Sequence, residues 1–266
     1  MSESAADEHD QSQAVTVSVV FQPDSTIFPI SPDIVLLSSD GVLFYVHSDF
    51  LRQRSSNDFK NLLTTMPHQA ESEPQTPVLA VNEDSQALNV ILHTIYGMPC
   101  EQFNPSNNTL AAAVAGLHEY GISLSAHIAP GMPLFALLAA RTPANALFVY
   151  TLAGRFDLYE LAVHASPFLL SLKPSDIPEA CADGMGPVYL QRLVGLREHR
   201  LQALKDILSE LPPGHPPTGS CGAEAQASLA TAWDLTAAYV LWEGKAGAQG
   251  PLPPTSPGGA HVLSQS

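Results

Sequence analysis

The chain has 266 residues, 45% of them hydrophobic, and a formal net charge of −15 from 26 acidic and 11 basic residues. This length is enough for two small domains, each with its own core, and the acidic balance argues against direct binding of nucleic acid. The three cysteines are isolated and odd in number, which favours a reducing, intracellular compartment over a disulfide framework or a cysteine-rich zinc site.

The two ends of the chain are predicted to be disordered. Residues 1–13 are polar and acidic, which is not typical of a secretory signal or of an Arg-rich transit peptide. Residues 244–266 are rich in Gly, Pro and Ser. Neither composition buries enough apolar surface to offset the entropy of ordering. The most apolar region, 132–154, is interrupted by Arg141 and Pro143, so no membrane span is expected.

Four strands are predicted in the first half. Residues 15–21 alternate apolar and polar side chains at first and suit an edge strand. The continuous apolar run 33–37 suits a strand that is buried on both faces. Residues 39–41, Ser-Asp-Gly, tolerate positive φ and should turn this strand into 42–46, which makes a hairpin. Residues 78–81 form a short fourth strand.

Helices are predicted from apolar positions three and four residues apart and from capping residues beside them. From Gly121 onward the pattern is wholly helical. The predicted helices are one with Phe50 and Leu51 capped by Ser48 or Asp49, one with Phe59, Leu62 and Leu63 capped by Ser55 or Ser56, one capped within 82–85 and ending at Gly97, one from Asn107 or Asn108 to Gly121, 144–153 opened by Thr142 and Pro143, 158–165 with a capping box of Asp157 and Glu160, 187–211 opened by Pro187, and 224–242.

The hairpin ends at a corner that carries Asp33, His47 and Ser48. These are the residue types of a nucleophile, a base and its orienting acid. However, His47 and Ser48 are adjacent at a strand-to-helix corner and should point to different faces. A buried polar side chain without a partner costs about 1–3 kcal/mol, so we expect these side chains to bond the strand to the helix. No catalytic residue and no cofactor is expected.

The second half carries the candidate partner-binding residues. Arg192, Arg197 and Arg200 lie on one predicted helix with acidic residues between them. They form either a solvated, salt-bridged face or a docking surface for an acidic partner. Trp242, near the end of the last helix, is a candidate contact residue because aromatic side chains dominate binding hot spots, whereas Trp233 is expected to pack in the core.

His215 and Cys221, with Cys181 upstream, are the residues that raise the question of a metal site. Structural zinc takes four ligands in closely spaced pairs, and the spacing of His215 and Cys221 fits no common scheme. No metal is therefore expected. A metal-dependent protein or enzyme that uses His47 or the His215/Cys221 region is the alternative.

Two motifs, in order, resemble a BTB/POZ domain. DIVLLSSDGVLFYVHSDFLRQRSSNDF, residues 33–59, resembles its opening, and VLAVNEDSQALNVILHTIYG, residues 78–97, resembles its later strand, acidic cap and helix. Later stretches such as EYGISL, MGPVYLQRL and TAWDLTAAYVLW resemble a fungal, basidiomycete group of BTB proteins with a helical C-terminal extension. The resemblance implies an α+β fold, in which a BTB/POZ-like three-stranded sheet wrapped by helices is followed by an all-α, BACK-like extension. We expect the first domain at 14–125 and the extension at 126–243.

The resemblance also implies a non-enzymatic protein–protein interaction module, an adaptor or scaffold inside the cell. Its expected partner is another protein: a second copy in a homodimer, or a cullin-type ubiquitin-ligase scaffold. Two positions depart from the family's pattern. Ser48 stands where transcriptional members carry a basic residue that pairs with the Asp, and the loop with Gln69 and Glu71 gives no clean apolar-x-Glu triplet for cullin docking. Cytoplasm and nucleus are not distinguished.

Overall fold

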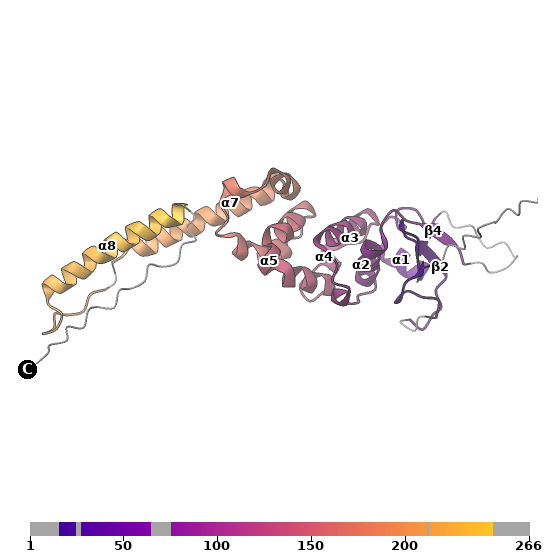
Figure 1. The fold of residues 1–266 in the computed structure, drawn as a ribbon, viewed down its shortest axis with the longest axis horizontal. Coiled ribbons are helices and arrows are strands. Elements are labelled where there is room, and N and C mark those ends of the chain that lie inside the picture. The colour runs from indigo at the N-terminus through magenta and orange to yellow at the C-terminus, as the bar shows by residue number, and fades with distance from the viewer. Residues whose placement is uncertain (1–15, 25–27, 65–75, 212, 247–266) are drawn as a thin grey trace, which may run out of the picture. The chain divides into compact units, whose positions relative to one another are not determined.

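The computed structural model describes residues 16–24, 28–64, 76–211 and 213–246 (Figure 1). These residues form two compact units. The first unit runs to Leu169 and includes Glu179–Tyr189, and the second comprises Leu170–Pro178 and the described residues from Leu190 onward. The boundary between the units thus differs from the domain boundary predicted at 125/126, since residues 126–169 belong to the first unit. The predicted disordered segment 1–13 and most of 244–266 lie outside the described residues.

The first unit contains a four-stranded sheet in the order β1-β3-β2-β4. The resemblance implied three strands. β2 and β3 form the predicted antiparallel hairpin, with Ile34 opposite Val46, while β1 pairs with β3 and β4 pairs with β2 in parallel. The edge position of β1 is confirmed, but the strand is shorter than predicted because the Ser18 Oγ accepts the Phe21 N–H (3.2 Å) and turns the chain. The strands are β1 (Thr16–Val17), β2 (Ile34–Leu37), β3 (Val42–Val46) and β4 (Val78–Ala80).

Helices make up most of the remaining described chain, so the α+β composition is confirmed (Figure 1). They are α1 (Ser48–Arg54), α2 (Ser85–Ile95), α3 (Asn107–Glu119), α4 (Leu124–His127), α5 (Pro133–Arg155), α6 (Tyr159–Ala165), α7 (Glu179–Ser209) and α8 (Ala223–Ala246), with short 3-10 turns at Glu101–Phe103, Ser166–Leu169 and Pro174–Asp176. α8 extends to Ala246, three residues into the segment that was expected to be disordered.

α2 is the best predicted helix. Asp84 begins it by accepting the Ala87 N–H (2.7 Å), and Gly97 follows its end with a φ of 69°. The N-cap of α3 is Ser106, one residue before the first predicted cap: Ser106 is extended and its Oγ accepts the Thr109 N–H (3.0 Å).

The helix predicted around Phe59 is wrong. Four consecutive residues, 58–61, have φ between 52° and 62°, which is the left-handed region. Such residues cost about 1–2 kcal/mol each, so contacts must hold them in place. The Phe59 ring is buried and stacks on Tyr120 (3.9 Å, 5°), and the Ser55 Oγ donates to the Tyr120 carbonyl (2.7 Å). This segment is therefore shaped by the end of α3 and not by its own helix propensity.

α5 begins at Pro133, about ten residues before the predicted start, and the predicted break appears inside it as the non-helical Asn145. The capping box before α6 is also wrong: Asp157 has a φ of 53°, and its carboxylate accepts the hydroxyl of Tyr189 (2.7 Å). Pro187 does open the second half of α7, because Gly186 interrupts that helix with a φ of 74°.

α5 is the one helix of the described residues that is long and apolar enough to cross a membrane by length and composition alone. One such helix is weak evidence for a span, because the core helices of many globular domains meet the same criteria. Arg141 and Pro143 lie inside α5, and Arg141 donates hydrogen bonds to the side chains of Asn104 and Asn107 (3.2 and 3.3 Å). α5 is thus tied to the segment around the start of α3.

Candidate partner-binding surface

Asp33 and Ser48 meet at the corner between the hairpin and α1. The Asp33 carboxylate accepts both the backbone N–H of Ser48 (2.7 Å) and its hydroxyl. The N-cap residue of α1 is His47, whose side chain makes no capping bond. The predicted cap by Ser48 or Asp49 is therefore wrong. The Asp33 carboxylate caps the helix instead, at the positive end of its dipole.

Both ring nitrogens of His47 and its backbone N–H are hydrogen-bonded to other residues. Its Nε2 lies 2.8 Å from the Ile30 carbonyl, which can only accept, so Nε2 carries the proton. Its Nδ1 then accepts the Tyr96 hydroxyl (2.9 Å), and the same hydroxyl oxygen accepts the His47 backbone N–H (3.0 Å). Burial is the main cause that raises the pKa of Tyr96 to about 12, so the hydroxyl stays a donor at neutral pH.

The corner residues thus belong to two separate hydrogen-bonded groups. Asp33 bonds Ser48, whereas His47 bonds Tyr96 and Ile30. A nucleophile, base and acid would need to be bonded in series. Each polar atom is instead used to join the strand, α1 and the end of α2, as the sequence led us to expect. Tyr96, which sequence reasoning missed, is the residue that links His47 to α2.

The second unit consists mainly of the second half of α7 and of α8. The less exposed residues of α8 recur along one side of the helix and face α7, where the Trp233 indole N–H donates to the Leu208 carbonyl (3.2 Å). They are Gln226, Ala230, Trp233, Ala237 and Leu241. Among the described residues of this unit only Leu193 and Ala237 are buried. Trp233 packs against α7 but is half-buried, whereas a core position was predicted for it.

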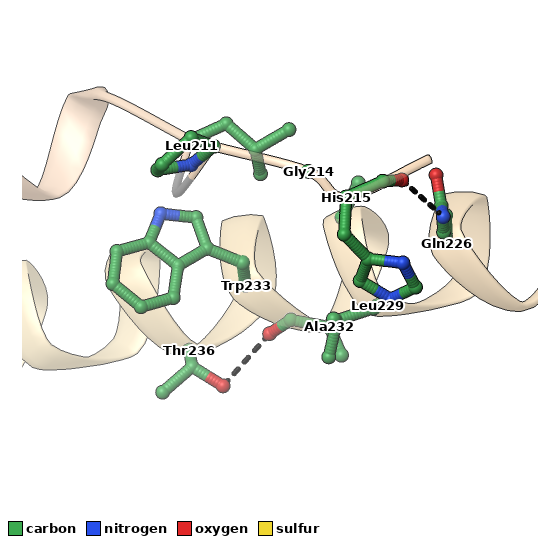
Figure 2. A pocket seen from close by; sticks show the side chains of 10 residues that line it. Leu211, Gly214, His215, Gln226, Leu229, Ala232, Trp233 and Thr236 are labelled. Atoms are coloured by element: carbon green, nitrogen blue, oxygen red, sulfur yellow. Dashed lines mark hydrogen bonds between the residues drawn. The ribbon is translucent and has the colours of Figure 1, made fainter. Parts of the chain in front are cut away.

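A pocket of about 420 Å³ lies between α8 and the chain that follows α7 (Figure 2). Trp233, Leu229 and Leu211 line it, and His215 lies above Leu229. Two of its polar groups are already bonded within the wall: the Gln226 amide donates to the His215 carbonyl (2.8 Å), and the Thr236 hydroxyl donates to the carbonyl of Ala232 (2.8 Å). The pocket therefore suits an apolar group held by contact more than a ligand held by hydrogen bonds.

A stripe of large side chains runs along the opposite side of α8. Leu235, Tyr239 and Trp242 stand at i, i+4 and i+7, so they share one face of the helix, and they are 68%, 58% and 69% exposed. We call these three residues the α8 stripe. Sequence reasoning pointed to Trp242 but missed Leu235, because a helix with so few charged residues does not indicate which side is free.

The predicted arginines lie on the second half of α7. Arg192 and Arg200 are exposed and Arg197 is half-buried. At 3.6 residues per turn, Arg192 and Arg197 are about 140° apart around the helix, so the three arginines do not form one stripe. Arg197 and Arg200 are the adjacent pair, and neither makes a salt bridge to another described residue. Their role in binding an acidic partner stays a prediction.

His215 and Cys221 are held by local bonds. The His215 Nδ1 lies 2.8 Å from the Pro216 carbonyl, and Cys221 pairs with Thr218 through backbone bonds of 3.0 and 3.2 Å. Cys181 is a free, half-buried thiol on the first half of α7. In the part of the chain that the structure describes, no three His, Cys, Asp or Glu side chains are grouped to hold a metal ion.

No protein-family model, curated protein or solved structure matches this chain. The BTB/POZ resemblance therefore stays a prediction from the motifs, and the candidate surface is defined by its geometry alone.

Proposed function

We propose that the chain is a non-enzymatic protein–protein interaction module, with a BTB/POZ-like first part and a helical second part that presents the docking surface. The observation that carries this proposal is the α8 stripe. Residues 225–242 contain a single charged residue, Asp234, yet only one side of this helix faces α7. Its exposed side carries the large side chains of the α8 stripe, and exposed apolar patches mark interaction sites.

The corner supports a structural role for the residues that first suggested catalysis. Asp33 and Ser48 are hydrogen-bonded to each other, and His47 is hydrogen-bonded to Tyr96 and Ile30. A reactive hydroxyl or imidazole would instead need a free side aimed at a substrate. We therefore assign these residues to holding the sheet, α1 and α2 together.

The partner is another protein in the same intracellular compartment. The homodimer face implied by the family resemblance pairs the Asp with a basic residue, whereas here Asp33 is bonded to the neutral Ser48. A second Asp33 brought to that face would meet an uncompensated like charge, which favours the second unit as the binding region. The loop of the proposed cullin contact, with Gln69 and Glu71, lies outside the described residues, so a ubiquitin-ligase scaffold stays a candidate partner.

Affinity capture with the full chain tests this function. Tagged wild-type chain is compared with the double variant Tyr239→Ala and Trp242→Ala, and with Ile207→Ala as the matched control, since Ile207 is 68% exposed on α7. We expect a defined partner with the wild type and the control, and a loss of at least about tenfold with the double variant, because exposed aromatic residues dominate hot spots. Failure of the wild-type chain to bind any protein, itself included, would contradict the proposal. Stoichiometric zinc or a bound substrate would favour the alternative.

A further inference from the structure

We propose that α8 pairs with α8 of a second copy of this chain, antiparallel and about a two-fold axis that passes beside the α8 stripe. This inference rests on the proposed function and names the partner of its surface. The pairing lies on the side of α8 away from α7, so it adds a helix to the helix pair without displacing the contact between Trp233 and Leu208.

The stripe is complementary to itself when the two helices run antiparallel. Leu235 and Tyr239 are one turn apart, so a two-fold axis midway between them places each against the other residue of the second copy. The same axis carries position 242 to position 232, because both are five residues from the midpoint at 237. Trp242 of one copy therefore lies over Ala232 of the other, a large side chain against a small one.

That tryptophan would lie at the rim of the pocket, because Ala232 is the pocket residue nearest to the stripe. Ala232 lines the pocket of about 420 Å³, beside Trp233 and Leu229 (Figure 2). Two polar groups of the pocket are already hydrogen-bonded within its wall. An indole suits such a pocket, since it has a large apolar surface and a single hydrogen-bond donor. Because of the two-fold symmetry, Trp242 of each copy contacts the pocket of the other copy.

Charge does not oppose this pairing, although the whole chain carries −15. The one charged residue between 225 and 242 is Asp234, and it stands about 100° around the helix from Leu235. The antiparallel arrangement therefore brings no two carboxylates into contact across the stripe. Like charges placed directly opposite would have argued for a different partner.

The available surface suits a reversible dimer. α8 has 24 residues and is about 36 Å long, and each aromatic side chain of the stripe can bury about 150–250 Å². The two aromatic residues together give about 300–500 Å², to which Leu235 and the pocket rim add. The total stays below the roughly 800 Å² per partner of a standard interface, as expected for a weak, reversible dimer. A membrane is the other apolar surface that such a helix could meet, but α8 does not reach the apolar composition that α5 has.

Light scattering coupled to size exclusion tests the pairing with the full chain. We expect a dimer at about 100 µM that dissociates on dilution, in the range of a reversible interface. Leu235→Asp should weaken the dimer at least about tenfold, because it buries a carboxylate against Tyr239 of the other copy. Ile207→Asp, a change of equal exposure on α7, should leave the dimer unchanged. Circular dichroism shows that each variant keeps its helices.

Cross-linking tests the register and does not depend on a destabilising charge. Cys181 and Cys221 are first replaced by Ser, and two single variants, Leu235→Cys and Tyr239→Cys, are made in that background. Mixed chains should form a disulfide between position 235 of one copy and 239 of the other under mild oxidation. A pair of Leu211→Cys chains, on the far side of the pocket, should not.

The outcomes separate this inference from the proposed function. A monomer at about 100 µM, or a dimer that Leu235→Asp leaves intact, overturns the pairing of α8. If that monomer still captures a defined partner through Tyr239 and Trp242, the interaction module stands with a different partner. If it sediments instead with phosphatidylcholine vesicles, the stripe is a membrane contact and both proposals fail.

Discussion

The two units bury apolar side chains to very different extents. Eight of the 11 residues of α2 in the first unit are buried, whereas α8 in the second unit has only Ala237 buried among its described side chains. Both helices are rich in apolar residues. The difference lies in the number of layers around them, because α2 is enclosed by other elements of its unit, whereas α8 packs, among the described residues, against α7 and the segment that follows α7. A helix of this kind gains its remaining stability by binding.

Hydrogen exchange should show the largest contrast between the units. At low micromolar concentration we expect the amides of α8 to exchange at least about 10³-fold faster than those of α2, since α8 opens locally and α2 opens only when its unit unfolds. Mass spectrometry of peptides from 85–95 and 225–242 measures this directly. Equal protection in the dilute chain would mean that α8 is already covered within one copy.

Core truncation should separate the units next. Leu88 on α2 is fully buried, so Leu88→Ala should lower the free energy of unfolding by about 2–5 kcal/mol through lost contacts and a cavity. Leu235→Ala on α8 removes the same atoms from a side chain that is 68% exposed and should change it by no more than about 0.5 kcal/mol. Urea denaturation of the monomer, followed by circular dichroism, measures both. Similar losses of unfolding free energy in the two variants would contradict the difference in burial between α2 and α8.

Tyr96→Phe should cost about 1–3 kcal/mol, because it leaves both the backbone N–H and the Nδ1 of His47 without the hydroxyl they share. The matched change Tyr239→Phe removes a hydroxyl from a residue that is 58% exposed and should have little effect on unfolding. Urea denaturation of the two variants under the same conditions makes the comparison. A stable Tyr96→Phe variant would show that water replaces the hydroxyl at the corner.

Asp33→Ala should cost about 0.5–2 kcal/mol, in the range of a lost helix cap, since the carboxylate accepts the first amide of α1. Asp33→Asn keeps one acceptor and should recover most of this loss. Thermal unfolding of the two variants beside the wild type separates a capping role from a purely charged one. Equal losses in both variants would assign the effect to the charge.

Local patterns were enough to predict the hairpin and α2, because alternating and three-to-four spacing is read directly from the chain. They failed where a distant residue decides the local structure. Phe59 leaves its predicted helix to stack on Tyr120, and Asp33 supplies the cap that Ser48 was expected to give. No signal near these residues in the sequence carries that information.

The candidate surface was predicted in part. Trp242 was identified from its residue type and its place near the end of the last helix, and it is exposed. Leu235 was missed because sequence reasoning singled out only the two tryptophans of this helix, and Trp233 faces α7. On a helix with one charge in 18 residues, only the position of the neighbouring helix shows which apolar side is free.

The smallest expected effect is a dependence of the first unit on pH through His93. Burial is the main cause that lowers the pKa of His93 from 6.5, partly offset by its bond to the Asn89 carbonyl (2.7 Å), and Phe21 and Phe103 contact its ring. The unfolded chain therefore takes up a proton that the folded chain resists. The stability is full above about pH 6.5 and declines as the pH falls toward the lower folded value. We expect His93→Phe to reduce the change in urea midpoint between pH 7.5 and 5.5, whereas His215→Ala, on an exposed residue of the second unit, leaves it unchanged. An unaltered pH dependence in His93→Phe would place the titrating group elsewhere.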